Sequence, residues 1–172
     1  MTKITGVRCI RTRPAGTWVV VKVLTDQPGL YGIGSAHDYN VTGAVVAAIE
    51  EWMAPRLIGR DASQIEDLWQ STFTSGYWRA GPTLNAALGG IDVALWDIKG
   101  KEAGMPVYQL LGGKCRAAVP CYAHASGATP EALEDDVRRY IEDGWPVIRC
   151  QLGPYGGCLL YTSDAADDLT RV

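Results

Sequence analysis

The longest regular pattern of apolar residues in the chain lies between Pro82 and Ala103. Large aliphatic side chains recur there at spacings of four and three residues, which places them on one face of an α-helix. They are Leu84, Leu88, Ile91, Leu95 and Ile98. Gly104 and Pro106 follow as the glycine and proline that end many helices. The pattern therefore predicts an amphipathic helix whose apolar stripe faces a core.

Two further features of this helix predict specific contacts. Asp97 and Lys101 stand four residues apart, the spacing of a favourable ion pair on a helix surface. Gly89 and Gly90 interrupt the helix interior, where each glycine is less favourable than alanine by about 1 kcal/mol. We expect another backbone element to pass close to these two glycines, because such packing would offset the cost.

The chain before this helix has strand patterns first and helical patterns afterwards. Residues rich in β-branched side chains occupy 3–13 and 17–25, and a Pro-Gly turn leads into a third apolar segment at 30–35. These segments predict three antiparallel strands. Helical periodicity then covers residues 43–53 and 63–75. The order of elements is typical of an α+β unit.

The pattern changes again after Gly113. Residues 118–123 predict a strand, and Thr129 followed by Pro130 predicts the start of a helix that ends near Gly144. Residues 147–151 predict a second strand. A strand, helix and strand of these lengths form a right-handed βαβ crossover with parallel strands. One such unit cannot close a sheet, so we expect the natural protein to continue.

Composition narrows the classes of protein that fit. The chain has 172 residues, 47% of them hydrophobic and 20% charged, with a formal net charge of −3. Such a balance is typical of a globular protein and argues against partners such as nucleic acid or an anionic membrane. No apolar run approaches the ~18 residues of a membrane span. Five cysteines without CxxC spacing and a polar N-terminus lead us to expect a cytoplasmic protein with reduced thiols.

The segment from Ala87 to Gly113 also carries a recognisable motif. It reads ALGGIDVALWDIKGKEAGMPVYQLLGG and resembles the N-terminal motif of the mandelate racemase and muconate-lactonising branch of the enolase superfamily. Four flanking segments resemble the mannonate and gluconate dehydratases within that branch. They are Leu57-Ile58-Gly59-Arg60-Asp61, Ile65-Glu66-Asp67-Leu68-Trp69-Gln70, Tyr77-Trp78-Arg79 with Gly81-Pro82, and Tyr122-Ala123-His124-Ala125-Ser126-Gly127. The resemblance extends over residues 1–157.

The resemblance implies both a fold and a reaction. The fold is an α+β N-terminal capping domain over residues 1–115, followed over residues 116–157 by the first βαβ unit of a truncated TIM-like (β/α) barrel. In the full-length protein, a homo-oligomer, a sugar acid would lose the proton α to its carboxylate, Mg²⁺ would stabilise the enediolate, and the 3-hydroxyl would leave. The family's metal ligands lie on later barrel strands, so we assign no metal ligand here and expect the fragment to be inactive.

Three residues are candidates for the site. Strand alternation places Arg149 on one face with Val147 and Gln151, and the resemblance implies that this arginine lies beside a tyrosine that acts as general base. Without the resemblance, the simpler interpretation of Arg149 is a surface arginine at the end of a strand. The resemblance further implies that His124 and Asn40 bind substrate, His124 from the first barrel strand and Asn40 from a loop of the capping domain. Trp78 and Arg79 are interpreted as packing residues.

Two other functions fit the same motifs. A catalytically weak family member could act as a regulatory or starvation-sensing protein. A racemase or cycloisomerase of the same superfamily would carry a lysine or histidine base on later strands. Residues on the third to eighth barrel strands would discriminate among these functions.

The last fifteen residues, CLLYTSDAADDLTRV, differ in character from the rest. Cys158 to Asp167 can be back-translated as TGT CTC TTA TAC ACA TCT GAC GCT GCC GAC, which resembles the adapter of a transposase-based sequencing library. We therefore interpret residues 158–172 as translated adapter and expect the natural sequence to end at Gly157 in this chain. An ordinary acidic C-terminal tail is the alternative.

Overall fold

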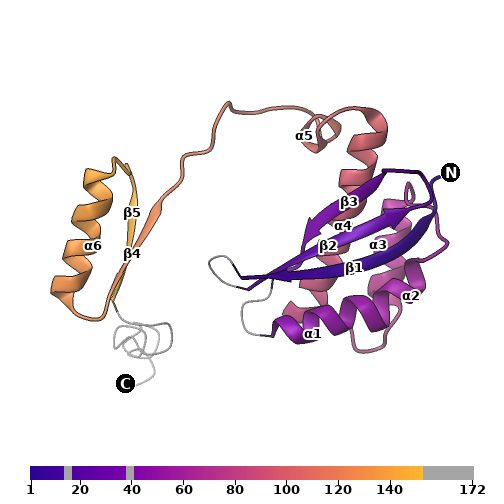
Figure 1. Ribbon diagram of the computed structural model, residues 1–172, viewed down its shortest axis with the longest axis horizontal. Helices are drawn as coiled ribbons and strands as arrows, with labels where there is room; N and C mark the ends of the chain where they lie inside the picture. Colours follow the sequence, from indigo (N-terminus) through magenta and orange to yellow (C-terminus); the bar gives the residue numbers. More distant parts are fainter. Residues whose placement is uncertain (14–16, 38–40, 153–172) are drawn as a thin grey trace, which may run out of the picture. The chain divides into compact units, whose positions relative to one another are not determined.

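In the computed structural model, which describes residues 1–13, 17–37 and 41–152, the strand-rich start of the chain forms an antiparallel sheet (Figure 1). Strands β1 (Ile4–Thr12), β2 (Trp18–Thr25) and β3 (Tyr31–Ser35) lie in the order β1-β2-β3. The β2–β3 turn is closed by Leu30 N–H, which donates to the Gln27 carbonyl at 3.1 Å. Gly29 has φ of +78°, the value that a type II turn requires at this position. The predicted sheet is confirmed.

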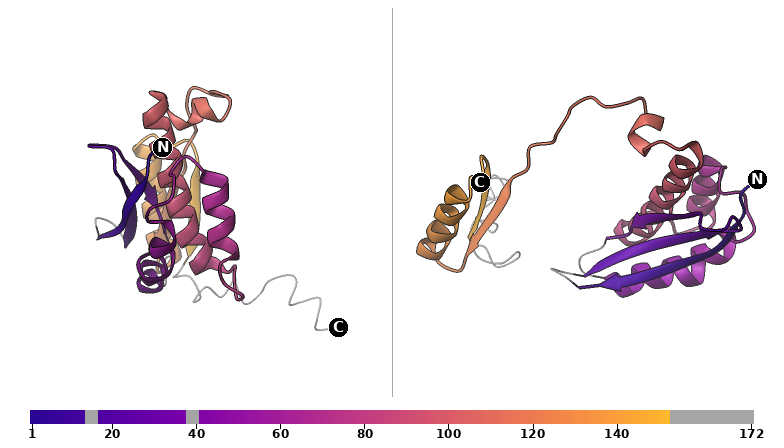
Figure 2. Two further views of the ribbon diagram at one scale, coloured as in Figure 1. Left: turned by 90° about the vertical axis from the view of Figure 1, so that its right-hand side faces the viewer. Right: turned by 45° about the horizontal axis from the view of Figure 1, so that its top comes forward.

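Helices form a second layer on one face of this sheet (Figure 2). Their bounds are α1 Thr42–Ala47, the π-helix η1 Ala48–Met53, α2 Ala54–Leu57, α3 Ile65–Thr74 and α4 Pro82–Ala103. The short helix α5 (Val107–Leu110) follows α4 and packs against it. Side chains that alternate along β2 face the helices, and Val19, Val21 and Val23 are fully buried there. The predicted apolar stripe of α4 forms the other side of the core, since Leu88, Ile91, Leu95 and Ile98 are buried.

Helix α4 and strand β3 pack with their backbones in direct contact. A Cβ atom at Gly34 would lie 1.9 Å from the Gly90 carbonyl oxygen, and one at Gly32 would lie 1.8 Å from that of Ala94. At Gly90 a Cβ would lie 2.7 Å from Ala36 Cβ. The expected close approach is therefore confirmed for Gly90, but it is wrong for Gly89, where a Cβ would meet no atom within 4 Å.

The predicted ion pair on α4 also ties the helix to the sheet. Lys101 Nζ lies 2.7 Å from Asp97 Oδ2, which confirms the predicted pair. The same carboxylate oxygen accepts a hydrogen bond from the Ile33 backbone N–H at 2.8 Å, and Lys101 Nζ donates to the Tyr31 carbonyl at 2.7 Å. These contacts cap the edge strand β3, whose polar backbone groups would otherwise remain available for pairing.

The helix predicted over residues 43–53 is longer and less regular than expected. It continues to Leu57, and residues 48–53 are wound as a π-helix in which Ala54 N–H donates to the Ile49 carbonyl. Pro55 explains the change, because proline has no N–H and its ring collides with the carbonyl four residues earlier. The wider turn before Pro55 avoids this collision while the chain stays helical.

A second compact unit begins at Arg116. It contains β4 (Ala123–Gly127), α6 (Pro130–Glu142) and β5 (Ile148–Leu152), and the two strands pair in parallel, as predicted. Thr129 Oγ1 accepts a hydrogen bond from Ala132 N–H at 3.2 Å and so caps α6. The predicted strand over 118–123 is wrong except for Ala123. Pro120 cannot donate to a ladder, and the first hydrogen bond to β5 is donated by Ala123 N–H to the Val147 carbonyl at 3.0 Å.

Within the described ranges, none of the helices combines the length and the apolar character needed to cross a membrane.

Candidate functional site

The candidate site lies on the face of the β4–β5 sheet that is opposite α6. Ala123 and Ala125 are buried on the α6 side, whereas His124 between them is exposed on the other face. The register pairs His124 of β4 directly with Arg149 of β5. Neighbouring strands lie ~4.8 Å apart, so the two side chains leave the same face as immediate neighbours. In a (β/α) barrel, the face opposite the helices lines the interior.

The structure changes the expected position of these residues along their strands. His124 was expected where its strand ends, but it is the second residue of β4, because this strand begins at Ala123 and runs to Gly127. Arg149 is likewise the second residue of β5. Ser126 and Gln151 form the next pair on the same face, one step closer to the carboxyl ends. The site face therefore comprises two registered pairs of polar residues.

The carboxyl end of β4 is held by the helix that follows it. Asp136 Oδ2 accepts a hydrogen bond from the Ser126 backbone N–H at 3.0 Å, and its other oxygen pairs with Arg139. A Cβ at Gly127 would lie only 2.3 Å from the Leu133 backbone nitrogen. The strand end is thus fixed both by a charge-assisted hydrogen bond and by direct backbone packing against α6.

The hydrogen bond from Ser126 makes a pH-dependent prediction. It lowers the pKa of Asp136 below the usual value of 3.8, and Arg139 lowers it further. Because the folded pKa lies below the unfolded one, this carboxylate stabilises the strand end above pH ~3.8, and that contribution is lost as the pH falls through the folded pKa. In an NMR titration, the Ser126 amide signal should shift with a midpoint below 3.8.

The matched variants are Asp136→Asn and Asp135→Asn. Asp136→Asn should abolish this step in the Ser126 titration, whereas Asp135→Asn, at an exposed α6 position, should leave it in place. A Ser126 titration that is unaffected by Asp136→Asn would contradict the hydrogen bond from the Ser126 amide to Asp136.

The described residues do not bring every sequence candidate together. Asn40 lies outside the described ranges, as do residues 158–172. His37, in the same segment as Asn40, is exposed and packs 5.6 Å from the Trp18 ring. Within 1–13, 17–37 and 41–152, no group of three or more His, Cys, Asp or Glu side chains is placed to hold a metal ion.

Sequence reasoning missed Asp136 and Gly127. The small residues Ala123, Ala125 and Gly127 stand at alternate positions, which could have indicated a strand face packed tightly against a helix. Asp136 gave no comparable signal, since it is one of several acidic residues on an exposed helix surface. Its contact with Ser126 depends on the loop geometry between β4 and α6.

Comparison with known families identifies the first unit. Residues 5–112 match the N-terminal domain of the mandelate racemase/muconate lactonizing enzyme family. The chain belongs to this family. Its three-stranded sheet with helices on one face is therefore the capping domain of an enolase-superfamily protein, and β4, α6 and β5 are the start of the barrel.

Individual relatives point to sugar-acid chemistry. A D-galactonate dehydratase family member from Paenibacillus sp. (strain JDR-2) is 65% identical over 157 residues, which cover 91% of this chain and 39% of the relative. Another, from Musicola paradisiaca, is 56% identical, with coverage of 90% and 37%. The chain thus spans less than two fifths of the length of these relatives.

Solved structures of related proteins share the fold of this chain. An enolase from Pantoea ananatis, crystallised with bound D-gluconate and Mg, is 53% identical and superposes with a TM-score of 0.82 over 88% of this chain and 37% of that one. An enolase-superfamily member from Salmonella Typhimurium is 30% identical, with a TM-score of 0.77 and coverage of 86% and 41%.

Proposed function

We propose that the complete protein is a hydro-lyase that removes water from a sugar acid of the mannonate or gluconate type. The observation that carries this proposal is the registered pair His124 and Arg149, which stands on the face that a barrel turns inward. Family membership supports it, as does the gluconate bound by the Pantoea ananatis structure. Because relatives are named as D-galactonate dehydratase family members, galactonate is a further substrate to test.

Arg149 would act through its fixed positive charge. A guanidinium next to a phenol or carboxyl group favours the ionised form of that group, which lowers its pKa. We propose that Arg149 serves in this way beside a tyrosine base, which the described residues do not include. His124, its neighbour, would hydrogen-bond a hydroxyl or the carboxylate of the sugar acid.

The reaction balances without an external reactant. The base takes the proton from C2, the C3–O bond breaks as its oxygen gains a proton, and water leaves. The resulting enol loses its hydroxyl proton as C3 takes one up, and this tautomerisation yields a 3-deoxy-2-keto acid. Mg²⁺ is the expected cofactor, and it would stabilise negative charge next to the carboxylate. The described residues offer no set of carboxylates for it, because the acidic side chains of the second unit lie on α6 or at its end.

The proposal also includes the domain bounds, the role of Asn40 and the oligomeric state. Residues 1–115 would be the capping domain, 116–157 the start of the barrel, and 158–172 translated adapter. Asn40 would contact substrate from the capping domain. The complete protein would be a homo-oligomer without nucleic-acid or membrane partners. The 172-residue chain alone would dehydrate no sugar acid, since the described residues include neither the proposed tyrosine base nor a group of side chains placed to hold a metal ion.

A chimera provides the test. Residues 1–152 of this chain would replace the matching part of the Pantoea ananatis enolase, which supplies the remaining barrel strands. We expect the chimera with Mg²⁺ to convert gluconate, mannonate or galactonate to a 3-deoxy-2-keto acid, measured by mass spectrometry. A folded chimera that converts none of them, while the unmodified Pantoea protein converts one, would contradict the proposal. Racemisation without loss of water would instead favour a racemase.

A further inference from the structure

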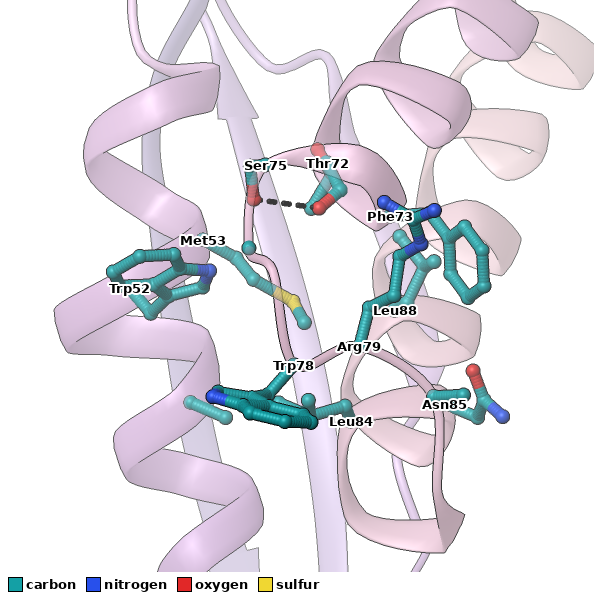
Figure 3. Close-up of a pocket in the computed structure, with 13 residues that line it drawn as sticks. Trp52, Met53, Thr72, Phe73, Ser75, Trp78, Arg79, Leu84, Asn85 and Leu88 are labelled. Atoms are coloured by element: carbon teal, nitrogen blue, oxygen red, sulfur yellow. Dashed lines mark hydrogen bonds between the residues drawn. The ribbon is translucent and has the colours of Figure 1, made fainter.

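A pocket in the first unit is lined by residues to which no role in the reaction is assigned. It lies where η1, α3, the segment 75–81 and the start of α4 meet (Figure 3). Its volume is about 250 Å³. Its large apolar lining residues are Trp52, Met53, Phe73, Trp78, Leu84 and Leu88. A cavity of about 150 Å³ can hold benzene, so this pocket has room for a larger aromatic group.

One lining residue, Thr72, has a buried side chain. It is only 4% exposed, and its Oγ1 has almost no accessible surface. The nearby Ser75 hydroxyl donates to the Thr72 carbonyl at 2.7 Å, as the dashed line in Figure 3 shows. The Thr72 hydroxyl is therefore out of reach of a ligand, and the charged group that lines the pocket is the Arg79 guanidinium.

The residues that line the pocket include one charged side chain, that of Arg79. Its guanidinium lies 6.0 Å from the Phe73 ring centre, and Figure 3 shows the two side by side. Arg56 stacks on Trp52 at 3.6 Å. No aspartate or glutamate is among the lining residues. This arrangement complements an anionic group attached to an apolar body.

The segment that carries Trp78 and Arg79 has a specific backbone conformation. Ala80 has φ of +79°, a region that residues other than glycine rarely adopt, and Gly81 follows with φ of +87°. Tyr77 and Trp78 are 86% and 87% exposed, and their rings pack edge to face 5.0 Å apart. Strained backbone of this kind is concentrated at functional sites. A ring bound in the pocket would cover part of the exposed Trp78 side chain.

We propose that this pocket binds a small aromatic carboxylate, with its ring among Trp52, Phe73 and Trp78 and its carboxylate toward Arg79. The size of the pocket, its aromatic lining, and the presence of Arg79 without an acidic lining residue together carry the assignment. All of the lining residues belong to the first unit, and none of them has a role in the proposed dehydration.

The test uses the 172-residue chain with indole-3-acetate and its uncharged analogue indole-3-acetamide as probes. Binding is followed by NMR through the indole N–H signals of Trp52 and Trp78. We expect saturable shifts at these two residues, with a Kd for indole-3-acetate on the order of 1 mM or lower. The acetamide should bind about fivefold more weakly, because it lacks the charge that Arg79 attracts.

Arg79→Gln is the deciding variant, and Arg8→Gln is its matched control on exposed β1. Arg79→Gln should reduce affinity for the acetate to that for the acetamide, whereas Arg8→Gln should leave both unchanged. Equal binding of the two probes to the unmodified chain would overturn the proposal. Shifts centred elsewhere, or none at concentrations up to about 10 mM, tenfold above the expected Kd, would also overturn it.

Discussion

Replacing Arg149 with alanine in the chimera is expected to lower kcat for sugar-acid dehydration by at least about 100-fold. The reason is electrostatic, because Arg149 is paired with His124 in the β4–β5 register and we propose that its positive charge favours the ionised base. Steady-state kinetics with the preferred sugar acid would measure the loss. The pH–rate profile should also change, with the acidic limb of any remaining activity shifted to higher pH, because the base would ionise only at higher pH.

Two matched variants separate this role from a structural one. Arg149→Lys keeps a positive charge and should retain more activity than Arg149→Ala, although it loses the planar fork of donors. Arg138→Ala removes an exposed arginine on the outer helix α6 and should leave kcat unchanged. If Arg149→Ala and Arg138→Ala had the same small effect on a folded chimera, the catalytic assignment of Arg149 would be refuted.

The second large effect is expected at Gly34. A Cβ there would lie 1.9 Å from the Gly90 carbonyl oxygen, which belongs to backbone and cannot swing away. Gly34→Ala should therefore push β3 away from α4 and lower the free energy of unfolding of the first unit by about 3 kcal/mol or more. Urea denaturation followed by tryptophan fluorescence would measure the change.

Gly89→Ala is the matched control on the adjacent helix. A Cβ at Gly89 would meet no atom within 4 Å, and alanine is the better helix former, so this variant should stabilise the chain by about 0.5–1 kcal/mol. Equal stability of Gly34→Ala and the unmodified chain would show that β3 and α4 are not packed backbone to backbone.

Local sequence rules predicted the elements that depend on local chemistry. The apolar stripe of α4 and its Asp97–Lys101 pair were predicted from spacing alone, and both are present. The cap of α6 by Thr129 and the parallel pairing of β4 with β5 were likewise predictable. In each case the decisive contacts lie within one helix or in a standard connection between neighbours.

The missed features depend on contacts between distant residues. The start of β4 was placed too early, because apolar side chains in 118–122 resemble a strand although β5 provides no partner before Val147. The direct pairing of His124 with Arg149 is a matter of register, which neither strand specifies by itself. The pocket around Thr72 is assembled from four segments, so no single segment indicates it.

The most direct test of the central claim is a crystal structure of the chimera with D-gluconate and Mg²⁺ bound. The account predicts the sugar acid on the inward face of β4 and β5, with a His124 ring nitrogen in hydrogen-bond reach of a substrate oxygen and Arg149 beside the catalytic base. A sugar acid bound in the barrel with both side chains turned away from it would contradict the claim that this chain contributes His124 and Arg149 to the site.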